Sequence, residues 1–148
     1  MKHLKKIFEF TESPVLIRKS EASDVKFLTK IINSPALNSY GYDSAFSEDY
    51  IGELVGGGYS IVAIEDDKIV GFIVGERLIS KSGLLLLHWV WRSPEAKSRD
   101  IFNSLMMECK KEFMYINSYI NEDVVKSLNI QEFSIGNKSL IEVCWTKK

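Results

Sequence analysis

The chain is poor in the residues that build disulfide frameworks and metal centres. Its 148 residues include two cysteines and two histidines. Two cysteines cannot make the dense disulfide network of a small secreted domain. Cys109 and Cys144 both lie in apolar segments, so reduced structural thiols are expected. No metal site is expected.

The sequence also lacks a long apolar run and an excess of either charge. No segment approaches the roughly 20 apolar residues that span a bilayer. Residues 1–10 carry positive charge but no long apolar region and no small-residue cleavage site, unlike a signal peptide. Nineteen basic and twenty acidic residues give a net charge of −1, so no basic field favours nucleic acid. These features predict a cytoplasmic protein that binds neither nucleic acid nor membrane.

The length and the 45% hydrophobic content are those of one domain with a well-filled core. We expect a single domain over residues 15–148, preceded by an arm over residues 1–14 that packs on it. The arm could instead serve in docking or dimer formation, so a monomer and a homodimer both remain open.

The most informative stretch runs from Leu84 to Lys111. Residues 84–91 form a continuous apolar run of strand length, typical of a strand buried on both faces. Residues 101–111 show the periodicity of an amphipathic helix. A polar turn joins the two, and a helix N-terminus that follows a buried strand in this way is a common anion site.

Similar patterns predict the remaining elements. Strands are expected at residues 15–18, 59–64, 69–77, 84–91, 113–120, 133–135 and 140–145, and helices at 23–32, 47–55, 101–111 and 121–128. Ser23 and Ser47 are expected to cap helices, and residues 65–68 to form the turn of a β-hairpin. The crossover helix makes its two flanking strands parallel, whereas hairpins are antiparallel. The expected fold class is therefore α/β, with a mixed sheet in a three-layer α/β/α arrangement.

Four segments resemble the GCN5-related N-acetyltransferase (GNAT) superfamily. They are Leu16-Ile17-Arg18 with Asp24, Ile69-Val70-Gly71-Phe72, Pro94 with Lys97 before the helix at 101, and Asn121 with Phe133. The resemblance runs from about residue 15 to the end of the chain. It implies the acyl-CoA N-acyltransferase fold, acetyl-CoA as co-substrate, and a small-molecule amine or a peptide as acceptor.

The resemblance also implies a donor site. It would use the strand around Val90, Trp91 and Arg92, together with Asn121. The phosphates would lie on the loop formed by Lys97, Ser98, Arg99, Asp100, Ile101 and Phe102. Ser98, Asp100 and Phe102 stand where the family carries glycines that let the backbone approach the pyrophosphate. We expect the Phe102 side chain to add bulk where the backbone and the phosphate should nearly touch. We expect the Asp100 carboxylate to repel the pyrophosphate by roughly 1 to a few kcal/mol.

The acid and base of acyl transfer have several candidates. His88 has a pKa range suited to taking a proton from an amine. The alternative, which the sequence favours, is a core histidine or one that bridges the sheet. Leu128 stands where the family usually has a tyrosine that protonates the thiolate, and Glu132 stands in place of a glycine. Tyr119, or Tyr115, could supply that hydroxyl, or could serve only in packing.

The irregular segment at residues 36–46 would lie over the acceptor groove in this family. Tyr40, Tyr42 and Asp43 are candidates for holding the acceptor, with Asp43 attracting an ammonium group. The same aromatic residues could instead anchor the segment to the core.

Two functions therefore remain open. One is an acyl-CoA-dependent N-acyltransferase with a modified phosphate loop. The other is a catalytically silent binding or regulatory module of the same fold, which Asp100, Phe102 and Leu128 favour. A structural partner that dimerises through its N-terminal arm is a third class.

Overall fold

A computed structural model describes residues 15–37, 45–78, 83–120, 134–135 and 141–146, with side chains to Ser118. The strands are β1 (Leu16–Lys19), β2 (Tyr59–Glu65), β3 (Lys68–Leu78), β4 (Leu84–Arg92), β5 (Tyr115–Ile120), β6 (Ser134–Ile135) and β7 (Ile141–Thr146). The helices are η1 (Ala22–Asp24), α2 (Val25–Ile32), α3 (Glu48–Gly57) and α4 (Ile101–Glu112).

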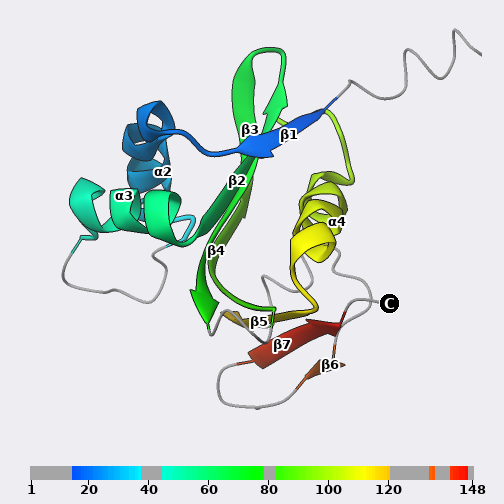
Figure 1. Cartoon of the computed structure of the whole chain (residues 1–148). Coiled ribbons are helices and arrows are strands. Elements are labelled where there is room, and N and C mark those ends of the chain that lie inside the picture. The colour runs from blue at the N-terminus through cyan, green and yellow to red at the C-terminus, as the bar shows by residue number, and fades with distance from the viewer. Residues whose placement is uncertain (1–14, 38–44, 79–82, 121–133, 136–140, 147–148) are drawn as a thin grey trace, which may run out of the picture.

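The strands form one sheet in the order β1-β2-β3-β4-β5-β7-β6. The β4–β5 pair, which α4 connects, is parallel, and the other described pairs are antiparallel. α2 and α3 cover one face of the sheet and α4 covers the other (Figure 1). The mixed sheet between two helical layers confirms the predicted α/β class and three-layer arrangement.

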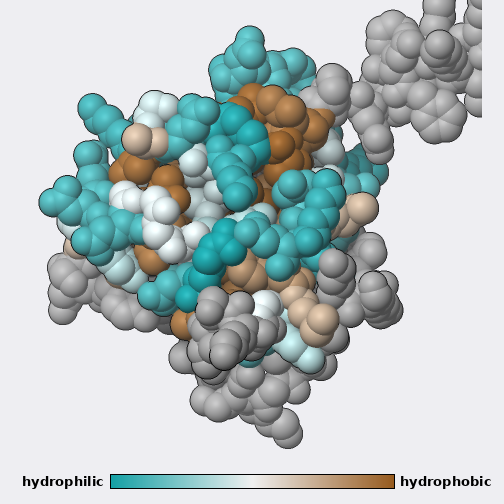
Figure 2. Space-filling view, in the orientation of Figure 1, coloured by the Kyte–Doolittle hydropathy of each residue, from teal (hydrophilic) through white to brown (hydrophobic). Residues whose placement is uncertain are grey.

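Each face of the sheet has its own apolar core. The core between the sheet and α4 includes Ile73 and Leu85 of the sheet and Leu105 of α4. The core on the other face includes Phe72 of β3, Leu28 of α2 and Ile51 of α3, all fully buried. At the edge of the sheet, Figure 2 shows an apolar patch beside the start of β1, where Leu16 is 60% exposed.

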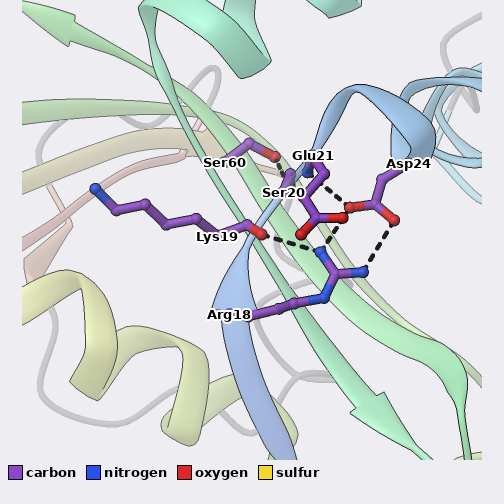
Figure 3. A network of polar contacts seen from close by, with 6 residues as sticks. All are labelled: Arg18, Lys19, Ser20, Glu21, Asp24 and Ser60. Atoms are coloured by element: carbon purple, nitrogen blue, oxygen red, sulfur yellow. Dashed lines mark hydrogen bonds and ion pairs between the residues drawn. The ribbon is translucent and has the colours of Figure 1, made fainter.

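The connection from β1 to α2 is held by a partly buried ion pair between Arg18 and Asp24. Arg18 donates from both terminal nitrogens to the Asp24 carboxylate, at 2.7 and 3.1 Å, and the Glu21 amide donates to the same carboxylate at 2.8 Å (Figure 3). The hydrogen bond from Arg18 holds the pKa of Asp24 below its usual range. Beside this network, the Ser20 and Ser60 hydroxyls lie 2.6 Å apart.

Capping residues and glycines in the sequence predicted both ends of α3. Ser47 caps α3 by accepting from the Tyr50 amide, and α3 ends at the glycines, with Gly58 as C-cap. The predicted cap at Ser23 was wrong, because a short 3₁₀ turn precedes α2 and its N-terminus is formed by Glu21 with Asp24. β5 begins at Tyr115 rather than at residue 113, since Phe113 is the C-cap of α4.

Two expectations lie outside the described residues. They are the arm over residues 1–14 and the helix over residues 121–128. The closing hairpin is confirmed, with Ser134 opposite Cys144 and Ile135 opposite Val143.

Candidate functional site

Strands β4 and β5 separate halfway along β4. Their parallel ladder runs from Leu84–Tyr115 to Leu87–Ser118 and ends there. At this last pair the buried Ser118 hydroxyl donates to the Leu87 carbonyl at 3.2 Å. Beyond it, β4 continues to Arg92 paired with β3, while β5 continues paired with β7. A wedge therefore opens in the sheet next to the second half of β4.

A β-bulge lies where the wedge begins. Val74 of β3 pairs with Trp89, but the next residue, Gly75, pairs with Leu87, so His88 is an extra residue in β4. The insertion reverses the alternation of the strand. Leu85 and Leu87 face α4 before the bulge, and Val90 faces α4 after it. Bulges of this kind redirect a side chain and end regular pairing.

The bulged His88 contacts a carboxylate on the neighbouring strand. Its Nε2 lies 3.0 Å from an Oε atom of Glu76, and the two side chains are 26% and 47% exposed. Glu76 is two residues beyond Val74, which packs in the core under α2 and α3, so this pair lies on the same face of the sheet. A carboxylate that accepts the proton of one ring nitrogen fixes the tautomer and leaves the other nitrogen able to accept a proton.

The two tryptophans after the bulge belong to the α2–α3 layer. Trp89 contacts Phe46 edge to face at 4.9 Å between ring centroids, and Trp91 lies 5.5 Å from Phe72. Phe27 of α2 also contacts Trp91, at 5.9 Å. The Trp91 indole therefore packs in the layer of α2 and α3, while its main chain lies in the part of β4 that borders the wedge.

The turn after β4 is anchored to the sheet. The Ser93 amide donates to the Val70 carbonyl at 2.8 Å, and the Ala96 amide donates to the Ser93 carbonyl at 3.1 Å. The Arg92 guanidinium donates to the Ser98 carbonyl at 3.0 Å, while its buried Nε has no hydrogen-bond partner in the described part of the chain.

The next two loop amides bind an internal carboxylate. Lys97 and Ser98 donate their main-chain N–H groups to the two oxygens of Glu65, at 2.8 and 3.1 Å. Glu65 ends β2 and is only 4% exposed. The Lys97 side chain, in contrast, is exposed and reaches Asp66 at 2.9 Å, and this hydrogen bond raises the pKa of Lys97.

The start of α4 presents a different surface. Ile101 and Phe102 are buried in the core, so the expectation that Phe102 places bulk towards a phosphate was wrong. Arg99 and Asp100 are exposed, and the Asp100 side chain makes no capping hydrogen bond. The first amides of a helix lack intrahelical acceptors, so this end of α4 can attract an anion.

Four of the predicted site residues lie outside the described part of the chain: Tyr40, Tyr42, Asp43 and Asn121. Tyr119 lies in β5 opposite Glu142, one residue beyond Ser118, and its side chain is also outside the description.

Two acidic residues near the site were missed by sequence reasoning. The sequence pattern predicts Glu65 in the hairpin turn, but Glu65 ends β2, and the turn consists of Asp66 and Asp67, both with positive φ. Glu76 had no assigned role. The hairpin pattern could have predicted that Glu76 lies on the strand next to His88. The bulge at His88, however, has no signal in the sequence.

Within the described residues, no group of three or more histidine, cysteine, aspartate or glutamate side chains is arranged to hold a metal ion. None of the described helices is long and apolar enough to cross a membrane. An open groove of about 610 Å³ runs along α2 and is lined by Ser23, Lys26, Phe27, Thr29, Lys30, Asn33 and Glu48.

The described fold is shared with solved acetyltransferase structures. PaiA N-acetyltransferase from Thermoplasma acidophilum, solved with coenzyme A, matches with a TM-score of 0.62 and 17% identity, over 90% of this chain and 99% of its own. YncA, a putative acetyltransferase from Salmonella typhimurium solved with acetyl-CoA, matches with a TM-score of 0.67 and 15% identity, over 92% of this chain and 95% of its own. A GNAT-family acetyltransferase from Staphylococcus aureus matches with a TM-score of 0.69 and 16% identity, over 91% of this chain and 100% of its own. No protein-family model and no curated protein sequence matches the chain.

Proposed function

We propose, from the fold shared with GNAT acetyltransferases, that this protein is an acyl-CoA-dependent N-acyltransferase. It would transfer an acetyl group from acetyl-CoA to an amine of a small molecule or peptide. The observation that carries the proposal is the wedge between β4 and β5. It opens at Leu87 and Ser118 and lies beside a loop that leads into α4.

The donor would lie along the second half of β4. Val90, Trp91 and Arg92 lie beyond the end of the β5 ladder and pair only with β3, so the main-chain groups that face the wedge need hydrogen-bond partners. The amide groups of a pantetheine arm would satisfy them. Because these contacts use the backbone, they do not depend on the side chains at these positions.

The residues at the loop fit a phosphate, with one opposing charge. The buried Nε of Arg92 has no partner in the described part of the chain, and the Phe102 ring is turned into the core. Asp100 opposes binding because its exposed carboxylate stands at the N-terminus of α4. Arg99, which is also exposed, would offset that charge.

Acyl transfer requires one proton to leave the amine and one to reach the thiolate. His88 is proposed as the base, because Glu76 holds its Nε2 and leaves Nδ1 to accept the amine proton. Tyr119 is proposed as the acid that protonates the thiolate. The acetyl-CoA thioester, when bound, supplies the activated acyl group.

The acceptor would approach from the segment at residues 38–44. Tyr40 and Tyr42 would contact it and Asp43 would attract its ammonium group. The solved structures of similar fold include a spermidine N-acetyltransferase from Vibrio cholerae, which is consistent with an amine acceptor.

A second candidate is a module of this fold that has lost catalysis. The exposed Asp100 carboxylate at the start of α4 favours it, as does the absence of glycine from residues 97–102. Such a protein would bind coenzyme A weakly or not at all.

Titration with acetyl-CoA separates these functions. A ligand at a hundred times its dissociation constant stabilises the native state by about 2.7 kcal/mol, which is a measurable rise in melting temperature. Binding with acetylation of an amine panel supports the enzyme, and binding without turnover supports the silent module. If millimolar acetyl-CoA left the melting temperature unchanged, a donor site would be excluded.

A further inference from the structure

The strongest unassigned feature is the contact between Glu65 and the loop before α4. Both carboxylate oxygens of Glu65 are used, one by the Lys97 amide and one by the Ser98 amide. These partners lie 32 and 33 residues from Glu65 in the sequence, and Glu65 is only 4% exposed. Burying a carboxylate costs free energy unless its oxygens accept hydrogen bonds, and here the two loop amides supply them.

The direction of approach decides what this contact does. Tyr59, Ile61 and Ala63 alternate along β2 and face α4, so Glu65 continues that row. Its carboxylate therefore meets the loop from inside the protein. The Lys97 and Ser98 amides both donate to that carboxylate, so they are already occupied and are not available to a ligand.

The same contact fixes where the next residues begin. The Ser98 carbonyl is held by Arg92, and the Ser93 amide by Val70, so the loop is tied at three places before α4 starts. At the start of α4, Ile101 packs closely against Gly71. The main chain from Arg99 to Asp100 is thus fixed between two anchors.

We infer that Glu65 is a positioning residue for the phosphate-binding end of the donor site. It fixes the backbone of a loop that contains no glycine, by accepting hydrogen bonds from two of its amides. The amides that follow, at the start of α4, are then presented to the pyrophosphate. This inference rests on the proposed function.

The contact itself can be measured without any ligand. Hydrogen exchange of the Lys97 and Ser98 amides, followed by NMR in the free protein, should be slow in the wild type. Glu65→Gln keeps the shape of the side chain but can accept only one of the two hydrogen bonds, so exchange should accelerate by at least about tenfold for one amide. Unchanged exchange at both amides would overturn the inference.

The effect on the donor is measured with two substrates. Acetyl-CoA carries the pyrophosphate, and S-acetylpantetheine does not. Glu65→Gln should raise KM for acetyl-CoA, and the dissociation constant of coenzyme A, by about tenfold or more. It should leave kcat/KM for S-acetylpantetheine unchanged. An equal loss with both donors, or no loss with either, would contradict a role at the phosphates.

Control variants separate positioning from stability. Asp66→Asn removes the neighbouring exposed pair with Lys97 and should change neither exchange nor coenzyme binding. Glu65→Asp keeps the charge but shortens its reach, and serves if Glu65→Gln does not fold; it should weaken coenzyme A binding in the same direction. If wild-type protein does not bind coenzyme A, the proposed function fails, and the exchange measurement still tests whether Glu65 holds the loop.

Discussion

Gly71 of β3 lies directly beneath Ile101, the first residue of α4. A Cβ at Gly71 would stand 2.6 Å from the Ile101 Cγ2 and 3.1 Å from the Trp91 carbonyl oxygen. The absence of a side chain at this one position lets the helix N-terminus approach the sheet next to the end of β4.

Gly71→Ala should therefore destabilise the protein by about 1–3 kcal/mol through overpacking. Urea denaturation of the single variant, of Ile101→Ala and of the double variant gives the coupling between them. We expect the double variant to lose less than the sum of the two. Gly56→Ala is the control, since nothing lies within 4 Å of its Cβ in α3, and it should stabilise by up to about 1 kcal/mol. Additive losses would contradict direct contact.

Asp24→Asn should cost about 1–3 kcal/mol at pH 7, because the Arg18 pair and the Glu21 amide lose their carboxylate. The wild type should also depend on pH. The pKa of Asp24 is lower in the folded state, so its contribution is complete above the unfolded value of about 3.9 and is lost as pH falls below it.

The measurement for Asp24 is urea denaturation of both proteins at pH 7 and near pH 3. The stability difference between them should shrink at the lower pH. Glu108→Gln, which removes an exposed pair with Lys111, should cost at most about 0.5 kcal/mol. A difference between wild type and Asp24→Asn that stays constant with pH would show that the carboxylate charge is not responsible.

His88 and Glu76 make separable predictions if the enzyme hypothesis holds. His88→Gln should lower kcat by about 100-fold or more, the usual effect of removing a general base. Glu76→Gln should lower kcat by roughly tenfold, or about 1.4 kcal/mol, with little change in KM for acetyl-CoA. Steady-state kinetics with saturating donor tests both. Wild-type kcat in His88→Gln would leave the histidine with a packing role only.

Cys109 should be unreactive in the folded protein. The residue is fully buried, and burial raises the pKa of its thiol to about 12. In a Cys144→Ser background, iodoacetamide at pH 8 should modify Cys109 only as fast as the protein opens, and denaturant should accelerate the reaction. Mass spectrometry follows the time course. Complete modification within minutes in native conditions would mean that α4 does not shield the thiol.

Elements with local signals could be predicted from the sequence. The hairpin of β2 and β3, the cap at Ser47 and the amphipathic α4 all follow from patterns within a few residues. The parallel pairing of β4 and β5 followed from the length of the crossover.

The candidate site could be predicted only in part. The wedge depends on how two strands end their pairing, and the contact between Glu65 and the loop joins residues 32 and 33 positions apart. The local preference of serine for helix N-termini predicts a cap at Ser23, but the Arg18–Asp24 pair determines how the chain enters α2. Tertiary contacts outweighed the local preference.

The extra residue in β4 has a consequence for how this sequence tolerates length changes. Deleting His88 would restore unbroken pairing, because Leu87 and Trp89 already pair with the adjacent residues Gly75 and Val74. Trp89 and Trp91 would stay on the face under α2 and α3, and Val90 on the face under α4. The strand can therefore lose this one position without moving any later side chain to the other layer, and the deletion would remove only the side chain that contacts Glu76.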